Sequence, residues 1–168
     1  ASPKLRVIAR AGVGYDRVDI PAATRHKIPV TITPNANHEG VAEQAFALLL
    51  SVAKSIVSYD VKLRAGVWAR DLVRPVRGTT LGIIGMGRIG QAVARRARGF
   101  DMRVIYSNRT RLSAAIEQAC NASFVSKEEL LRQADFVTLH MPYSPESHHL
   151  IGAKEIAFLN GCSITFMS

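Results

Sequence analysis

The sequence is poor in cysteine, in aromatic residues and in long apolar runs. Cys120 and Cys162 stand alone, without the CxxC or Cys/His spacing of a redox or metal site, so we expect two reduced thiols and no bound metal. The longest apolar stretch, residues 45–53, is far too short to cross a bilayer, and no signal-peptide pattern opens the chain. These absences predict a globular, cytoplasmic protein that does not act in a membrane.

Acidic residues are also few. Asp and Glu number 13 against 22 Lys and Arg, which gives a formal net charge of +9. Such a charge would suit nucleic acid, but the basic residues are scattered, and no zinc-finger, RNA-recognition or basic-zipper pattern occurs. We therefore expect a small anionic ligand and no nucleic acid, bound by a chain whose 48% of hydrophobic residues predicts a folded core.

Strand and helix patterns alternate along the first half of the chain. We predict a buried strand at residues 5–10 and a second strand at 28–33. Between them we predict a helix at 19–27, because Asp19 and Pro21 are typical of a helix N-terminus. One long helix, apolar over much of its circumference, is predicted over 39–58. The arm that follows, residues 64–80, has Trp68 as its large apolar residue, and we expect this side chain to pack.

From Leu81 onward the alternation becomes regular. The predicted strands are residues 80–85, 102–107, 135–142 and 162–168, and the predicted helices are 88–100, 111–120, 126–134 and 152–160. Alternating strands and helices favour a parallel sheet with helices on both faces. The predicted fold class is therefore α/β, with a doubly wound, Rossmann-like parallel sheet.

Three glycines follow the apolar strand in LGIIGMGRIG, residues 81–90. Gly85 would allow a tight turn, Gly87 would leave room for a pyrophosphate, and Gly90 would let a helix pack closely on the sheet. The N-terminus of that helix would present free N–H groups to the phosphates. The alternative is that the glycines serve only the turn.

The residues after the next strand bear on the choice of cofactor. An NAD site usually carries an acidic residue there, but this strand ends in Ser107, Asn108, Arg109 and Thr110, with Arg111 close by. A carboxylate would repel a 2′-phosphate, whereas a guanidinium binds one through charge-assisted hydrogen bonds. We therefore expect NADP(H), with NAD as the alternative if the arginines are only solvated cations.

Four segments together resemble the D-2-hydroxyacid dehydrogenases, the family of phosphoglycerate dehydrogenase and glyoxylate/hydroxypyruvate reductase. In chain order they are VIARAGVGYDRVDIPAATRHKIPVTITP, VAEQAFALLLSVAK, GTTLGIIGMGRIGQAVARRARGFDMRVI and ADFVTLHMPYSPESHHLIGAKEIAFL. The resemblance implies hydride transfer between a nicotinamide and a small 2-hydroxy or 2-keto acid, such as glyoxylate, hydroxypyruvate or phosphoglycerate.

The resemblance also implies a division of the chain. Residues 1–34 would be a β-α-β remnant of a substrate domain, 35–74 the interdomain and dimerisation helix with its arm, and 75–168 a truncated, incomplete dinucleotide-binding domain.

Single residues have expected roles as well. His140 would cap the end of a strand and take no part in catalysis. The substrate carboxylate would meet Gly12, Val13 and Gly14. The further cofactor contacts would be Arg88, Ile89, His140, Met141 and Pro142.

The same resemblance places the catalytic groups elsewhere. The family uses a histidine, a glutamate and an arginine, and the strand at 163–168 would end one residue before that arginine, with Phe166 in place of the usual asparagine. We therefore expect a fragment of a homodimeric enzyme that binds cofactor weakly and contains no catalytic residue. The alternative is a non-catalytic, co-repressor-like module of the same superfamily that senses the cofactor.

Overall fold

The computed structural model describes residues 4–159 and 163–166. The chain divides into two compact units, Ala1–Gly40 and Val41–Ser168. The first unit contains β1 (Ile8–Ala9), α1 (Ile20–Arg25) and β2 (Val30–Thr31), and its two strands are parallel. The side chain of Asp19 caps α1 by accepting a 2.8 Å hydrogen bond from the Ala22 N–H.

The strands of the first unit are shorter than the sequence predicts. The predicted strands over 5–10 and 28–33 were wrong in extent, because only two residues of each strand pair, with Ile8 opposite Val30. The prediction that the first strand is buried was also wrong, since Leu5 and Val7 are exposed. The physical reason is that a two-stranded sheet covered by one short helix cannot bury both of its faces.

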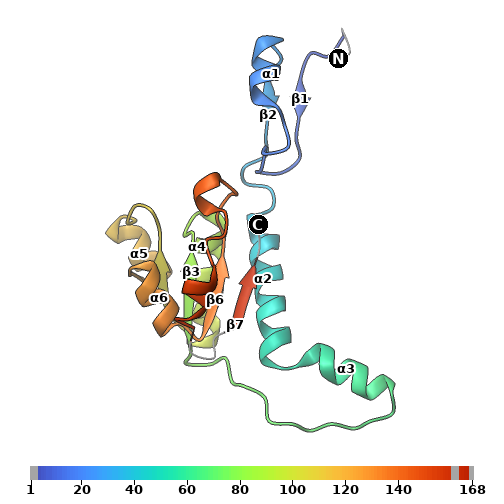
Figure 1. The fold of residues 1–168 in the computed structure, drawn as a ribbon, viewed down its shortest axis with the longest axis vertical. Helices are drawn as coiled ribbons and strands as arrows, with labels where there is room; N and C mark the ends of the chain where they lie inside the picture. Colours follow the sequence, from blue (N-terminus) through green and yellow to red (C-terminus); the bar gives the residue numbers. More distant parts are fainter. Residues whose placement is uncertain (1–3, 160–162, 167–168) are drawn as a thin grey trace. The chain divides into compact units, whose positions relative to one another are not determined.

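The second unit is built on a five-stranded parallel sheet in the order β5–β4–β3–β6–β7 (Figure 1). This order confirms the predicted α/β, doubly wound fold. β5 was not predicted, because three residues are too few for a period-two pattern. Residues 162, 167 and 168 of the last predicted strand lie outside the described residues. The strands are β3 (Thr80–Ile84), β4 (Arg103–Ser107), β5 (Ala122–Phe124), β6 (Phe136–Leu139) and β7 (Ser163–Phe166).

Helices cover both faces of this sheet. On β3, Leu81 and Ile83 join the apolar cluster that holds α2 (His38–Ala53) and α4 (Arg88–Ala97), whereas Ile84 joins the cluster that holds α6 (Lys127–Gln133). Neighbouring residues of one strand therefore serve opposite faces, as a buried parallel strand requires. The remaining helices of this part are α5 (Ala114–Cys120), α7 (Ala153–Ile156) and the 3₁₀ turns η1 (Arg98–Phe100) and η2 (Pro145–Ser147).

The single helix predicted over 39–58 is wrong, because the chain forms two helices there. α2 ends at Ala53, and α3 (Ile56–Arg64) begins after Ser55, whose left-handed φ of 53° does not fit inside an α-helix. Within the described ranges, no single helix is long and apolar enough to cross a membrane. α2 and α3 together have the length and composition, but they are bent by 61°.

The two helices have different surroundings. α2 packs on the sheet through Phe46, whose ring stacks on that of Phe100 with 5.4 Å between centroids. Every residue of α3, all of them described, is exposed or half-buried. The Tyr59 hydroxyl of α3 donates a 2.7 Å hydrogen bond to the Asp71 carbonyl of the arm. Trp68, which was predicted to pack, is 77% exposed, so that prediction was wrong.

Candidate functional site

The turn between β3 and α4 requires two of the predicted glycines. Gly85 follows the buried strand with a φ of +96°, which L side chains rarely adopt. A Cβ at Gly85 would lie 2.5 Å from the His140 carbonyl oxygen, and one at Gly90 would lie 2.4 Å from the Gly85 carbonyl oxygen. Neither position can accept a side chain unless the backbone moves.

Gly87 serves a different purpose, because the space around it is open. A Cβ built at Gly87 would meet no described atom within 4 Å. Gly87 is the N-cap residue of α4, a helix of 10 residues, so the first N–H groups of that helix are directed toward the open space. Arg88 is exposed and Ile89 is half-buried at this end. A pyrophosphate therefore fits at the start of α4.

The strand order reverses between β3 and β6, and doubly wound sheets bind ligands in the crevice outside the carboxyl ends of such strands. Gly85 follows β3 and His140 follows β6. The two ends are joined by a 2.8 Å hydrogen bond from the His140 N–H to the Ile84 carbonyl. The structure thus brings together two groups of predicted cofactor residues that are 50 or more positions apart in the sequence.

His140 is buried and uncharged. Its Nε2 lies 2.8 Å from Thr138 Oγ1, and its Nδ1 has no partner among the described residues. Burial lowers the pKa of the imidazole from 6.5 to about 4. A general acid or base at neutral pH would need a pKa closer to 7, so the ring acts here as a neutral cap on β6. Beside it, Met141 is half-buried and Pro142 is exposed.

Asn108 holds the glycine turn. Its side-chain oxygen accepts a 2.7 Å hydrogen bond from the N–H of Met86, the residue between Gly85 and Gly87. Ser107, the last residue of β4, accepts a 3.1 Å hydrogen bond from the Gly85 N–H through its carbonyl oxygen. The sequence indicated Asn108 as a ligand contact but missed Met86, because no local pattern reports a contact between residues 22 positions apart.

The two arginines after Asn108 have different partners. Arg109 is exposed, like Thr110, and forms no ion pair with any described residue. Arg111 is bound to Glu117 of α5 by two hydrogen bonds of 2.9 Å. This guanidinium holds the pKa of the Glu117 carboxyl below its usual range, and so does the Tyr106 hydroxyl. Arg109 is therefore available to a ligand, whereas Arg111 is engaged within the protein.

Gly12, Val13 and Gly14 form the loop after β1 in the first unit. The Gly12 N–H donates a 2.7 Å hydrogen bond to Thr33 Oγ1, and the Gly12 carbonyl accepts a 3.0 Å bond from the Thr33 N–H. The guanidinium of Arg10 donates to the Gly14 carbonyl. Of the three loop N–H groups predicted to face a carboxylate, those of Val13 and Gly14 have no partner among the described residues.

Comparison with known proteins identifies the family. Residues 46–164 match the family model described as D-isomer specific 2-hydroxyacid dehydrogenase, NAD binding domain. The chain belongs to this dehydrogenase family. The match includes the glycine turn, Asn108 and His140, and it confirms the resemblance predicted from the four sequence segments. A nicotinamide cofactor is therefore supported for the D-2-hydroxyacid dehydrogenase domain.

Relatives and solved structures agree with the family. A glyoxylate reductase of Thermococcus litoralis is 46% identical over 167 residues, which cover 94% of this chain and 50% of that protein. The crystal structure of a glyoxylate reductase from Paecilomyes thermophila has a TM-score of 0.87 at 38% identity, covering 96% of this chain and 49% of that chain. Apo D-mandelate dehydrogenase of Rhodotorula graminis has a TM-score of 0.85 at 29% identity, covering 96% and 50%. The chain thus spans about half the length of these relatives.

Proposed function

We propose that the chain carries the cofactor-binding part of an oxidoreductase that transfers a hydride between NADP(H) and a small 2-hydroxy or 2-keto acid. The observation that carries the proposal is the open N-terminus of α4 at Gly87, on the turn held by Asn108, with the unpaired Arg109 directly after Asn108. The glyoxylate reductases among the relatives favour glyoxylate or hydroxypyruvate as substrate, and phosphoglycerate belongs to the same chemical class.

Each part of the site has its own role in binding the cofactor. The N–H groups of α4 and the Arg88 guanidinium bind the pyrophosphate, because Gly87 leaves the approach open. Asn108 keeps the turn in shape through Met86, and the neutral His140 closes the crevice at β6. The nicotinamide, when bound, donates or accepts the hydride. The crevice is completed by Ile89, Ser107, Thr110, Met141 and Pro142.

The residues after β4 favour NADP(H) over NAD(H). Asn108 replaces the carboxylate that would repel a 2′-phosphate, and Arg109 offers a guanidinium that binds phosphate through charge-assisted hydrogen bonds. The nearby Glu117 carboxylate is neutralised by Arg111, so it adds little repulsion. NAD remains the second cofactor to be tested.

We further propose that the unpartnered N–H groups of Val13 and Gly14 bind the substrate carboxylate. Backbone N–H groups of a glycine loop suit this role, because they bind an anion without adding a titratable group. The acid/base histidine, its glutamate and the arginine clamp of the family have no counterpart in the matched segments. We therefore expect residues 1–168 alone to bind cofactor without turnover.

Titration of the protein with NADPH and NADH, followed by nucleotide fluorescence, tests the cofactor proposal. We expect tighter binding of NADPH, and Arg109→Ala should weaken NADPH by about tenfold while changing NADH little. Arg70→Ala, at an exposed arginine of the arm, is the matched control and should change neither affinity. Tighter binding of NADH by the wild type would contradict the choice of NADP(H).

Asn108→Asp separates charge from structure in the same experiment. An aspartate can still accept the Met86 N–H, so the turn is kept, but its charge repels a 2′-phosphate and suits ribose hydroxyls. The preference should therefore move toward NADH. Turnover of glyoxylate or hydroxypyruvate by the full-length protein tests the reaction, and a protein that binds cofactor but turns over no 2-keto acid would favour the co-repressor-like alternative.

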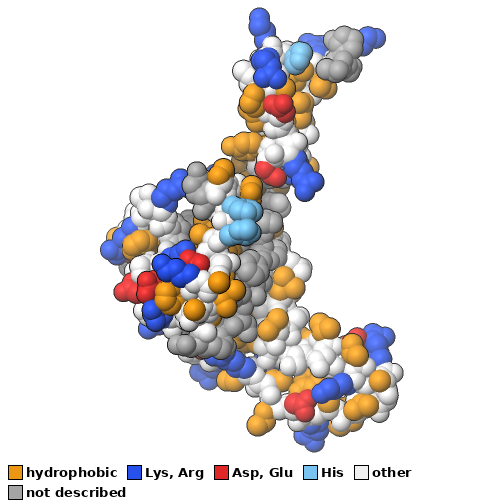
Figure 2. Space-filling view, in the orientation of Figure 1, with side chains coloured by type: hydrophobic (Ala, Val, Ile, Leu, Met, Phe, Trp, Pro, Cys, Tyr) orange, Lys and Arg blue, Asp and Glu red, His pale blue; other side chains and the backbone are white. Residues whose placement is uncertain are grey.

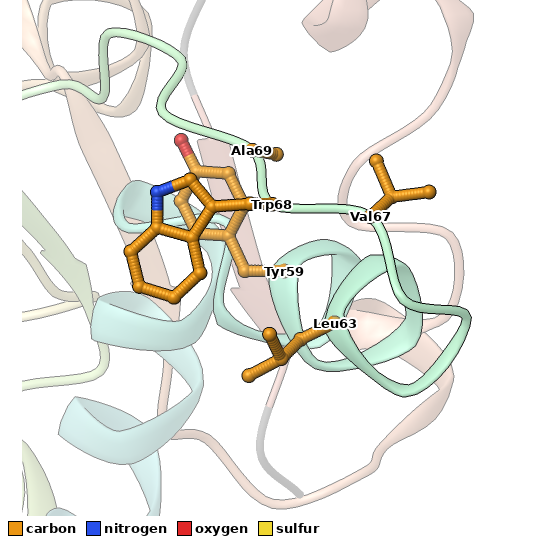
Figure 3. A pocket seen from close by; sticks show the side chains of 5 residues that line it. All are labelled: Tyr59, Leu63, Val67, Trp68 and Ala69. Carbon is orange, nitrogen blue, oxygen red and sulfur yellow. The ribbon is translucent and has the colours of Figure 1, made fainter.

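We also propose a homodimer, formed through an apolar surface on α3 and the arm. We call it the arm surface; it consists of Leu63, Val67 and Trp68 around a pocket, with Leu72 further along the arm, and all four are exposed. Figure 2 shows apolar side chains among charged ones at this end of the molecule. A shallow pocket of about 200 Å³ lies on it, lined by Tyr59, Leu63, Val67, Trp68 and Ala69 (Figure 3). The Leu72 side chain is fully exposed, so the arm also offers an apolar side chain that is free to enter the pocket of a second copy.

A further inference from the structure

The loop after β4 is tied down at both of its ends. At its start, Asn108 accepts the Met86 N–H at 2.7 Å. At its end, the Leu112 N–H donates a 2.9 Å hydrogen bond to the hydroxyl of Tyr106, a fully buried side chain of β4. Arg109 lies between these two ties, so its backbone position is fixed although its side chain is exposed.

Glu117 of α5 uses both of its carboxylate oxygens within the protein. Oε1 accepts a 2.8 Å hydrogen bond from the Tyr106 hydroxyl and one of 2.9 Å from Arg111 Nε, and Oε2 accepts one of 2.9 Å from Arg111 Nη2. The Glu117 side chain is only 13% exposed, whereas that of Arg111 is 65% exposed. The Arg111 guanidinium also lies 6.0 Å from the centroid of the Phe124 ring.

We infer that Glu117 is a positioning residue that sets cofactor specificity. It holds Arg111 away from the adenosine ribose and leaves Arg109 as the arginine of this loop that meets a 2′-phosphate. The inference rests on the proposed function, because it assumes a dinucleotide at the glycine turn. For Arg111 to bind the phosphate, it would have to leave a mostly buried carboxylate with the Tyr106 hydroxyl as its remaining partner, which is unfavourable.

A purely structural role for Glu117 makes a different prediction. If the carboxylate only fastened α5 to β4 through Tyr106, its loss would loosen the loop and weaken NADPH and NADH alike. If it holds Arg111, its loss frees a second guanidinium near the ribose, and only the ligand with a 2′-phosphate gains. The ratio of the two affinities therefore separates the two roles, whatever the absolute affinities are.

The experiment is a double-mutant cycle on the full-length protein, with dissociation constants for NADPH and NADH measured by fluorescence titration. Glu117→Gln keeps an acceptor for the Tyr106 hydroxyl and removes the charge that binds Arg111. We expect it to raise the preference for NADPH by about threefold to fivefold, the gain typical of one partly exposed ion pair. Adding Arg111→Ala should return the preference to that of the wild type, while Arg111→Ala alone should change it by less than about twofold.

Tyr106→Phe is the control for loosening of the loop, because it removes both the other partner of Glu117 and the acceptor of the Leu112 N–H without freeing Arg111. It should weaken NADPH and NADH alike and leave the preference between them unchanged. The inference is overturned if Arg111→Ala alone lowers the NADPH preference as much as Arg109→Ala, or if Glu117→Gln weakens both cofactors equally. A wild type that binds neither dinucleotide would instead refute the proposed function, and this inference with it. Thermal melts of each variant check that it is folded.

Discussion

At the scale of single residues, His140 links the two strands that flank the reversal of the sheet. Its N–H donates a hydrogen bond to the Ile84 carbonyl, and its own carbonyl lies against Gly85, so the backbone just after β6 limits which residue can follow β3. The side chain contributes no charge to the site, because burial keeps the imidazole ring neutral at physiological pH. Backbone and side chain of one residue thus contribute separately to the site.

The buried ring gives stability a defined pH dependence. The pKa of His140 is about 4 in the folded chain, against the ordinary value of 6.5 that the ring regains on unfolding, so the unfolded chain binds more protons between these values. The stability tied to the neutral ring is complete above pH 6.5 and is lost as the pH falls to about 4, by about 3 kcal/mol in total. His140→Gln should remove this part of the pH dependence in urea unfolding. Parallel curves for wild type and variant would contradict the assignment.

From the sequence, the positions of the glycines in the turn could be predicted, but the side-chain hydrogen bonds around the turn could not. Gly85, Gly87 and Gly90 could be assigned because a strand–turn–helix needs glycine at such spacing. The bonds of Asn108 to Met86 and of Glu117 to Arg111 could not be predicted, since each depends on side-chain directions that sequence spacing does not report. Glu117 lies in α5, six positions after Arg111 in the preceding loop, and no helical or strand period predicts a contact at that spacing.

At the scale of elements, β3, the glycine turn and α4 form one strand–turn–helix unit. Substitutions of its glycines should have different effects on stability. Gly85→Ala should lower the free energy of unfolding by about 2–4 kcal/mol, because the methyl group meets the His140 carbonyl and the φ is left-handed. Gly87→Ala has open space and a negative φ, but alanine is a poorer N-cap than glycine, so the loss should be about 1 kcal/mol or less, smaller than that of Gly85→Ala.

The same pair of variants separates folding from binding. The methyl group of Gly87→Ala would occupy the open space proposed for the pyrophosphate, so this variant should fold normally and bind NADPH more weakly. Denaturant unfolding together with nucleotide titration measures both effects. A Gly87→Ala variant with unchanged affinity would show that phosphate binds elsewhere, and a stable Gly85→Ala variant would contradict the turn geometry.

Elements with strong local signals were predicted well, and those with weak signals were not. α6 was predicted over 126–134 and begins after its N-cap Ser126, because a capping box forms there, with Ser126 and Glu129 each accepting the backbone N–H of the other. The break between α2 and α3 escaped prediction because Ser55 interrupts the helix through its backbone conformation, while the apolar spacing continues on both sides. Apolar periodicity predicts that a segment is helical but does not locate a bend.

At the scale of the whole molecule, the arm surface predicts self-association. Light scattering should show a dimer, and Leu72→Asp or Trp68→Asp should raise its dissociation constant at least about tenfold, because each places a charge where apolar surface would be buried. Gln118→Asp, at an exposed position of α5, is the control and should leave the dimer intact. A wild type that remains monomeric at high concentration would contradict the proposed homodimer.

The hydrogen bond between Asn108 and Met86 has a consequence for how cofactor choice can change over evolutionary time. Position 108 must keep a short side chain with an oxygen acceptor, or the glycine turn loses its support. Asparagine and aspartate both meet this requirement, and they differ by the negative charge that separates the two cofactors. A lineage could therefore exchange one nicotinamide cofactor for the other by a single substitution that leaves the fold of the turn intact.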